Sequence, residues 1–175
     1  MRLHAFLTAA VVLAGSGPAL AASSPPRASE AILLKADGTE AGRAKLVDRK
    51  DGVHVTVDVS GVQPGTHGLH LHTTGQCTPP DFASAGGHWN PTQRAHGHEA
   101  PQGAHLGDLP NIEVGPDGRG SAQALISGAT LKPGALSVHD ADGTAIVLHA
   151  GPDDYVSDPA GNSGARVACG VVETR

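Results

Sequence analysis

Aromatic side chains are scarce in this 175-residue chain, at 2% of residues, with two Phe, one Trp and one Tyr. A hydrophobic core must therefore be built from Val, Leu, Ile and Ala. No uninterrupted apolar run approaches the roughly 18 residues of a membrane-spanning helix, so no transmembrane segment is expected. The 12 Lys and Arg against 17 Asp and Glu give a net charge of −5, which excludes a globally basic nucleic-acid binder. The length suits one domain.

Glycine, proline and histidine are the abundant residues. The 24 Gly and 13 Pro disfavour helix interiors and favour short strands joined by turns and long loops. Eleven His stand against a single Met and a single Trp. Because imidazole is the commonest metal ligand among side chains, this composition points to metal binding.

The first 22 residues have the pattern of a secretory signal peptide. Arg2 supplies the positive charge, residues 5–14 the apolar segment, and Ala19-Leu20-Ala21 the small-x-small cleavage pattern. We expect a signal peptide over 1–21 with cleavage near Ala21/Ala22, a linker over 22–30 and one domain over 31–175. The protein would then be periplasmic or otherwise secreted, with no Cys near the cleavage site to accept a lipid anchor. The alternative is an apolar first strand.

An alternating pattern over residues 53–59 predicts a strand with one buried face. Val53, Val55, Val57 and Val59 would face one way and the intervening side chains the other. Asp-Gly pairs separate several similar runs, as hairpins require. Further strands are predicted over residues 31–36, 44–48, 68–72, 111–114, 122–126, 136–139, 145–149 and 165–172. The expected fold is an all-β, eight-stranded sandwich or flattened barrel.

Two stretches, residues 73–110 and 150–164, lack a strand pattern. Long irregular segments in a compact domain are usually functional or disordered. Seven of the eleven His lie between His67 and His105, so the first loop is predicted to be functional.

A pair of histidines begins the candidate metal site. His70 and His72 are two residues apart on a predicted strand, so both imidazoles project from the same sheet face and can converge on one ion. His149 ends another predicted strand just before the second irregular stretch. It could supply a further nitrogen to the same ion.

A second ligand set lies in the first irregular stretch. Three His and one Asp make a complete tetrahedral set for Zn²⁺ with no position left for water, which is typical of a structural site. Its members are His88, His96, His105 and Asp108.

The only two cysteines, Cys77 and Cys169, are 92 residues apart. In an exported chain such a pair favours one disulfide. Two separate metal thiolates are the alternative, although neither Cys belongs to a CxxC pair.

Several segments together resemble the copper/zinc superoxide dismutases, most closely the secreted bacterial members. The resemblance extends from about residue 31 to residue 172. It implies an eight-stranded Greek-key β-sandwich and the dismutation of superoxide by a redox-cycling copper with a structural zinc. The segments that carry it are residues 67–72 (HGLHLH), 84–91 (SAGGHWNP), 105–109 (HLGDL) and 161–170 (GNSGARVACG).

The resemblance also implies particular ligands. His88 would be shared between the two ions as a bridging imidazolate and would carry a proton during catalysis. The implied copper ligands are His70, His72, His88 and His149. The implied zinc ligands are His88, His96, His105 and Asp108.

Other roles follow from the same resemblance. Asp153 would accept hydrogen bonds from a copper histidine and a zinc histidine, and its spacing from His149 distinguishes it from Asp154. His67 would pack near the copper without binding it. Arg166 would attract and orient superoxide, the alternative being a salt bridge to a loop acid. Cys77 and Cys169 would form the intrachain disulfide.

The remaining histidines match no ligand position. We expect His98 to be a solvated loop residue and His54 and His139 to be surface residues, while His4 would leave with the leader.

Two departures from the eukaryotic members are visible. Residues 78–82 form a longer loop, and no Lys lies between His149 and Arg166. The sequence leaves open whether the protein is a monomer or a homodimer. A non-catalytic metal carrier and the copper-only branch of the family are the alternative functions.

Overall fold

The alternating valines form the middle of strand β3 (Gly52–Val59) and line the core. All four are at most 4% exposed, whereas His54 and Asp58 face solvent. The strand pairs with β2 (Glu40–Asp48) on one side and β7 (Gly120–Ser127) on the other, both antiparallel. The predicted period of two is therefore confirmed.

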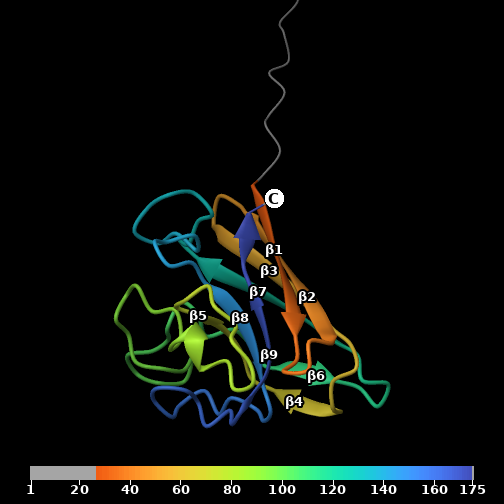
Figure 1. The fold of residues 1–175 in the computed structure, drawn as a ribbon. Coiled ribbons are helices and arrows are strands. Elements are labelled where there is room, and N and C mark those ends of the chain that lie inside the picture. Colours follow the sequence, from red (N-terminus) through yellow and green to blue (C-terminus); the bar gives the residue numbers. More distant parts are fainter. Residues whose placement is uncertain (1–26, 175) are drawn as a thin grey trace, which may run out of the picture.

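The computed structural model describes residues 27–174, whose strands form a nearly closed antiparallel barrel (Figure 1). The order of hydrogen-bonded neighbours is β4-β6-β7-β3-β2-β1-β9-β8-β5, with β10 paired to β1. Because β4 and β5 are separated only by Gly68, the two ends of this order meet and the sheet closes on itself. The other strands are β1 (Ala28–Leu34), β4 (Gly65–His67), β5 (Leu69–His72), β6 (Ile112–Val114), β8 (Ala145–His149), β9 (Arg166–Val171) and β10 (Glu173–Thr174).

The all-β prediction is confirmed, and if β4 and β5 are taken as one interrupted strand, the barrel within residues 27–174 has the eight expected strands plus the short β10. The strand predicted over residues 136–139 is wrong. Val138 is fully buried there, and its backbone N–H donates to the Thr130 carbonyl (2.9 Å), but the contact between these segments is only an isolated bridge of Ser137 with Thr130. The apolar pattern of this segment reflects the burial of Val138 and not a strand.

The first strand begins earlier than predicted. Ala28, Ser29 and Glu30 pair with Val47, Leu46 and Lys45 of β2, so the predicted linker is wrong over its last three residues. The sequence prediction also missed β4 and β10, which contain only three and two residues. The predicted signal peptide lies outside the described residues.

The two irregular stretches lie at the same end of the barrel, beside β5 and β8 (Figure 1). The first contains a single 3₁₀ turn, η1 (Ala83–Ala85). Its backbone is fastened to β5, because Leu71 donates to the Gly107 carbonyl (2.9 Å) and accepts from the Trp89 N–H (2.7 Å). Trp89 itself is 2% exposed and belongs to the core. No helix in residues 27–174 is long and apolar enough to cross a membrane.

Candidate metal centre

Four buried histidines converge at the end of the barrel where the loops lie. His70 and His72 project from β5, His149 ends the adjacent antiparallel β8, and His88 comes from the first loop. Each offers one ligand nitrogen, and these nitrogens all lie within 4.8 Å of one another. We refer to these residues as the four-histidine cluster.

One ring nitrogen of every member of this cluster has no hydrogen-bond partner, although it is buried. Burying an unsatisfied polar nitrogen is costly, and native proteins avoid it unless the atom serves another purpose. The unpaired atoms are Nδ1 of His70 and Nε2 of His72, His88 and His149. Four such nitrogens within 4.8 Å of one another form a donor set that suits a transition-metal ion such as copper.

The opposite ring nitrogens are held by the protein. His70 Nε2 lies 2.7 Å from Asp153 Oδ2, His72 Nδ1 lies 2.9 Å from the Gly86 carbonyl, and His149 Nδ1 lies 3.1 Å from the Gly164 carbonyl. Each of these nitrogens donates its proton to an oxygen, which leaves the unpaired nitrogen with a free lone pair. The rings are therefore fixed in the tautomer that can bind a metal.

Three histidines and one carboxylate form a second cluster, which shares His88 with the first. His88, His96, His105 and Asp108 are all buried, and their ligand atoms again lie within 4.8 Å of one another. Around Asp108 Oδ1, the Nδ1 atoms of His88, His105 and His96 lie at 2.8, 3.1 and 3.2 Å. We refer to these residues as the Asp108 cluster.

These spacings fit a small tetrahedral ion. Zinc-to-ligand bonds of about 2.0–2.1 Å place tetrahedral ligand atoms about 3.3 Å apart. Two nitrogens, His88 Nδ1 and His105 Nδ1, are 3.4 Å apart. His96 Nδ1 has no hydrogen-bond partner despite its proximity to Asp108, so it is also available as a ligand. The donor set has no thiolate, and three imidazoles with one carboxylate suit zinc.

A single carboxylate connects the two clusters. Asp153 is 3% exposed and accepts from His70 Nε2 (2.7 Å) and from His96 Nε2 (3.0 Å). Asn111 holds its backbone through a pair of hydrogen bonds of 2.9 Å each. Gly161 must lack a side chain, because a Cβ there would overlap the Asp153 carboxylate. Asp154 instead caps the turn at Ser157 (2.8 Å).

Burial keeps the rings of His70, His72 and His149 neutral. Desolvation lowers the pKa of His70 to about 4, of His149 to about 3 and of His72 to about 2. Burial also opposes the charge on Asp153, but hydrogen bonds from His70 and His96 outweigh it and lower the pKa to about 2. At neutral pH the rings of His70, His72 and His149 are therefore neutral and Asp153 is ionised. A neutral imidazole is the form of histidine that binds metals.

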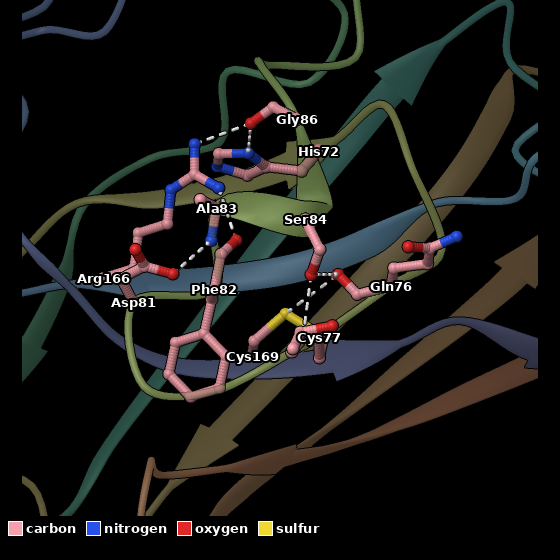
Figure 2. The surroundings of a disulfide bond; sticks show 11 residues. His72, Gln76, Cys77, Asp81, Phe82, Ala83, Ser84, Gly86, Arg166 and Cys169 are labelled. Atoms are coloured by element: carbon pink, nitrogen blue, oxygen red, sulfur yellow. Dashed lines mark hydrogen bonds between the residues drawn. A yellow bond between two sulfur atoms is a disulfide. The ribbon is translucent and has the colours of Figure 1, made fainter.

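Arg166 lies at the start of β9, in register with His149. Its guanidinium donates to the backbone carbonyls of Phe82 and Gly86, both at 2.6 Å, instead of forming the loop salt bridge considered from sequence (Figure 2). The Gly86 carbonyl also accepts from His72, so this carbonyl connects Arg166 to the four-histidine cluster. An open cavity of about 480 Å³ lies beside Arg166, lined by Pro80, Asp81, Ala83, Gly164, Ala165 and Arg166.

The other histidines of residues 27–174 are outside both clusters. His67 is buried, with its two ring nitrogens 2.7 and 2.8 Å from the carbonyls of His149 and Gln63. His54 is exposed beside Asp51. His98 is exposed, but its ring also contacts the Asp108 carbonyl (2.9 Å). His139 departs from the surface prediction, because it is partly buried against the Ser29 hydroxyl (2.7 Å).

Cys77 and Cys169 form a disulfide, with their Cα atoms 5.6 Å apart. The alternative of two metal thiolates is therefore wrong. Sequence reasoning missed the roles of three residues. The backbone carbonyls of Phe82 and Gly86 hold Arg166, and the side chain of Asn111 holds the backbone of Asp153. The role of a backbone carbonyl has no residue-type signature, so the contacts of Phe82 and Gly86 could not be read from the sequence.

Comparison with known proteins gives a consistent result. A family model of copper/zinc superoxide dismutase matches residues 40–172. Cu-Zn superoxide dismutase 2 of Aquifex aeolicus is 43% identical over 164 residues, covering 92% of this chain and 96% of that protein. The crystal structure of a superoxide dismutase-like protein from Bacillus subtilis matches with a TM-score of 0.77 and 37% identity, covering 81% of this chain and 96% of that one. The Brucella abortus Cu/Zn superoxide dismutase matches with a TM-score of 0.67 and 29% identity, covering 83% and 99%.

A nearly closed antiparallel barrel with two adjoining buried ligand clusters that share one histidine defines a two-metal protein. Together with the matches over most of its length, this places the chain among the oxidoreductases that use copper and zinc. The chain belongs to the copper/zinc superoxide dismutase family.

Proposed function

We propose that this protein dismutates superoxide outside the cytoplasm, with copper held by the four-histidine cluster and zinc by the Asp108 cluster. The observation that carries the assignment is the set of four unpaired, buried ring nitrogens on His70, His72, His88 and His149. The complete Asp108 cluster favours the two-metal enzyme over the copper-only branch. When bound, copper supplies one-electron redox chemistry and zinc a fixed positive charge.

The residues of the chain supply the proton handling. Two superoxide anions and two protons give one dioxygen and one hydrogen peroxide. His88 is the member of both clusters, with Nε2 facing the copper ligands and Nδ1 facing Asp108. Held at Nδ1, it can keep its orientation while Nε2 takes up or releases a proton. Asp153 fixes His70 and His96 from the opposite side.

Arg166 supplies the anion recognition. Its guanidinium borders the open cavity and donates to the Gly86 carbonyl, which also accepts from His72. No Lys lies between His149 and Arg166, and among the residues that line the cavity Arg166 is the basic one. A non-catalytic carrier would have no use for a cation in this position. We therefore favour the enzyme over the carrier.

Function outside the cytoplasm rests on two features. A disulfide persists in oxidising compartments and is rare in the cytosol. The first 22 residues carry the signal-peptide pattern, and we propose cleavage near Ala21/Ala22. The mature domain would begin with the segment that leads into β1. N-terminal sequencing of exported protein tests the cleavage position.

The proposed activity is tested on mature protein reconstituted with stoichiometric copper and zinc. We expect one ion of each per chain and rapid superoxide decay in pulse radiolysis, with metal-free protein inactive. Full metal occupancy without dismutation would favour the carrier, and activity with copper alone at the same rate would remove the role of zinc.

Neutralising Asp81 is expected to increase the rate. This carboxylate lines the cavity beside Arg166 and repels an approaching anion, while its Oδ1 accepts from the Ala83 N–H (3.0 Å). Asp81→Asn retains an oxygen acceptor and removes the charge. A unit charge about 7 Å from a monovalent anion in water changes its energy by about 0.6 kcal/mol, so kcat/KM should rise about two- to threefold at low salt.

Asp117→Asn is the matched control. Asp117 also accepts from the N–H two residues later, Arg119 (3.2 Å), but lies in the turn between β6 and β7. Its kcat/KM should not change. The gain from Asp81→Asn should disappear at high ionic strength. A gain that persists at high salt would show that charge repulsion is not the cause.

Thiol titration of denatured, unreduced protein is expected to find no free thiol, and two per chain after reduction. A double Cys77→Ser, Cys169→Ser variant opens a loop of 92 residues, so its free energy of unfolding should fall by about 4–5 kcal/mol in the chain-entropy model. Chemical denaturation measures this loss. Two free thiols in freshly exported protein would contradict both the disulfide and the proposed compartment.

A further inference from the structure

Phe82 occupies a backbone conformation that bulky residues avoid. Its φ of 55° and ψ of 25° lie in the left-handed region, immediately before η1. For a large side chain this conformation is strained, so the surrounding structure must hold it in place. Strained residues of this kind cluster at functional sites, and the residues on either side of Phe82, Asp81 and Ala83, line the cavity beside Arg166.

The phenyl ring provides the anchor. Phe82 is 2% exposed and belongs to a small apolar cluster that is separate from the barrel core. This cluster includes the cysteines of the disulfide, and Figure 2 shows the ring beside Cys169. The other members of the cluster are Ala85, Ala145, Val147, Cys169 and the partly buried Cys77.

The backbone carbonyl of Phe82 is a hydrogen-bond acceptor for Arg166. The Phe82 carbonyl accepts from Nη1, and the Gly86 carbonyl, at the other end of η1, accepts from Nη2, both at 2.6 Å. The guanidinium is thus held across the two ends of one short turn (Figure 2). Two hydrogen bonds in a fixed fork define both the position and the plane of an arginine head group.

We propose that Phe82 is the positioning residue for Arg166. Its ring, beside the disulfide, holds the left-handed turn, and the turn presents the two carbonyls that orient the guanidinium toward the cavity. Glycine would adopt the same φ without strain but would have no ring to fix the turn. The proposal rests on the proposed function only for its kinetic consequence, because the positioning itself can be measured without metal.

The direct test is chemical modification of Arg166 by phenylglyoxal in metal-free protein, quantified by peptide mapping. Phe82→Ala and Phe82→Gly both remove the anchor, and each should speed modification of Arg166 at least fivefold. Phe82→Leu keeps an apolar side chain in the cluster and should react within twofold of the wild type. The glycine variant relieves the backbone strain, so it keeps the test available if the alanine variant does not fold.

Ile126→Ala is the control for general loosening. Ile126 lies on β7 and is as buried as Phe82, at 2% exposed. It belongs to the barrel core and not to the small apolar cluster that contains Phe82. Its loss should lower the Tm without changing the reactivity of Arg166. Unchanged Arg166 reactivity in folded Phe82→Ala and Phe82→Gly would overturn the proposal, as would equal acceleration in Ile126→Ala.

The kinetic test is a double-mutant cycle on protein loaded with both metals. Phe82→Gly should lower kcat/KM for superoxide about fivefold in the wild-type background and less than twofold in the Arg166→Gln background. Equal losses in both backgrounds would mean that Phe82 acts on something other than Arg166. If Arg166→Gln alone has no effect on kcat/KM, the proposed role of Arg166 fails, while the modification experiment still decides whether Phe82 positions it.

Discussion

Replacing His88 by alanine is expected to lower both copper and zinc content and to reduce dismutation by at least 100-fold. His88 is the only residue shared by the two ligand clusters found within residues 27–174. Its Nε2 faces His70, His72 and His149, and its Nδ1 lies 2.8 Å from Asp108 Oδ1. One substitution therefore removes a donor from each proposed site. Metal analysis by mass spectrometry and a superoxide assay measure the two effects.

Two further variants make the result specific. His105→Ala removes a member of the Asp108 cluster alone and should chiefly reduce zinc. His54→Ala removes an exposed histidine outside both clusters and should leave both metals in place. Wild-type copper and zinc contents in His88→Ala would show that His88 is not a shared ligand.

Arg166→Gln is expected to lower kcat/KM for superoxide by one to two orders of magnitude, about 1.4–2.7 kcal/mol of transition-state stabilisation. Superoxide is a small anion, so its approach depends on the local positive potential and on ionic strength. Copper and zinc should be retained, because the guanidinium bonds backbone carbonyls and belongs to neither ligand cluster. Pulse radiolysis across a salt series is the measurement.

The salt series separates guidance from a structural effect. The rate of the variant should fall less steeply with added salt than that of the wild type. Arg119→Gln removes the same charge from the exposed turn between β6 and β7 and should resemble the wild type. Unaltered activity of Arg166→Gln at full metal occupancy would mean that another group recruits the substrate.

The sequence predicts the features that depend on regular spacing. Alternation over residues 53–59 locates β3, and the two-residue spacing of His70 and His72 places both on one face of β5. The resemblance to the family implied the members of both ligand clusters, and the structure brings those side chains together. The alternation and the two-residue spacing are informative because side chains two apart on a strand share one face of the sheet.

Features that depend on tertiary context were not predictable. Val138 is as apolar as a strand residue, yet it fills the core from a loop, whose pairing is limited to an isolated bridge between Ser137 and Thr130. Ala28 joins β1 because β2 supplies a partner. The carbonyls of Phe82 and Gly86 determine where Arg166 points, and a backbone oxygen is common to every residue type.

The fastening of the first loop to β5 has a consequence for association between molecules. One side of β5 pairs with β8, and the other side is covered by the segments around His88 and Asp108 through isolated bridges at His72 and His70. An uncovered strand edge is a template on which a second chain can add a strand. The segments that carry His88 and Asp108 therefore also prevent a second chain from adding a strand to β5. The same stretch of chain thus supplies metal ligands and protects the protein from aggregation.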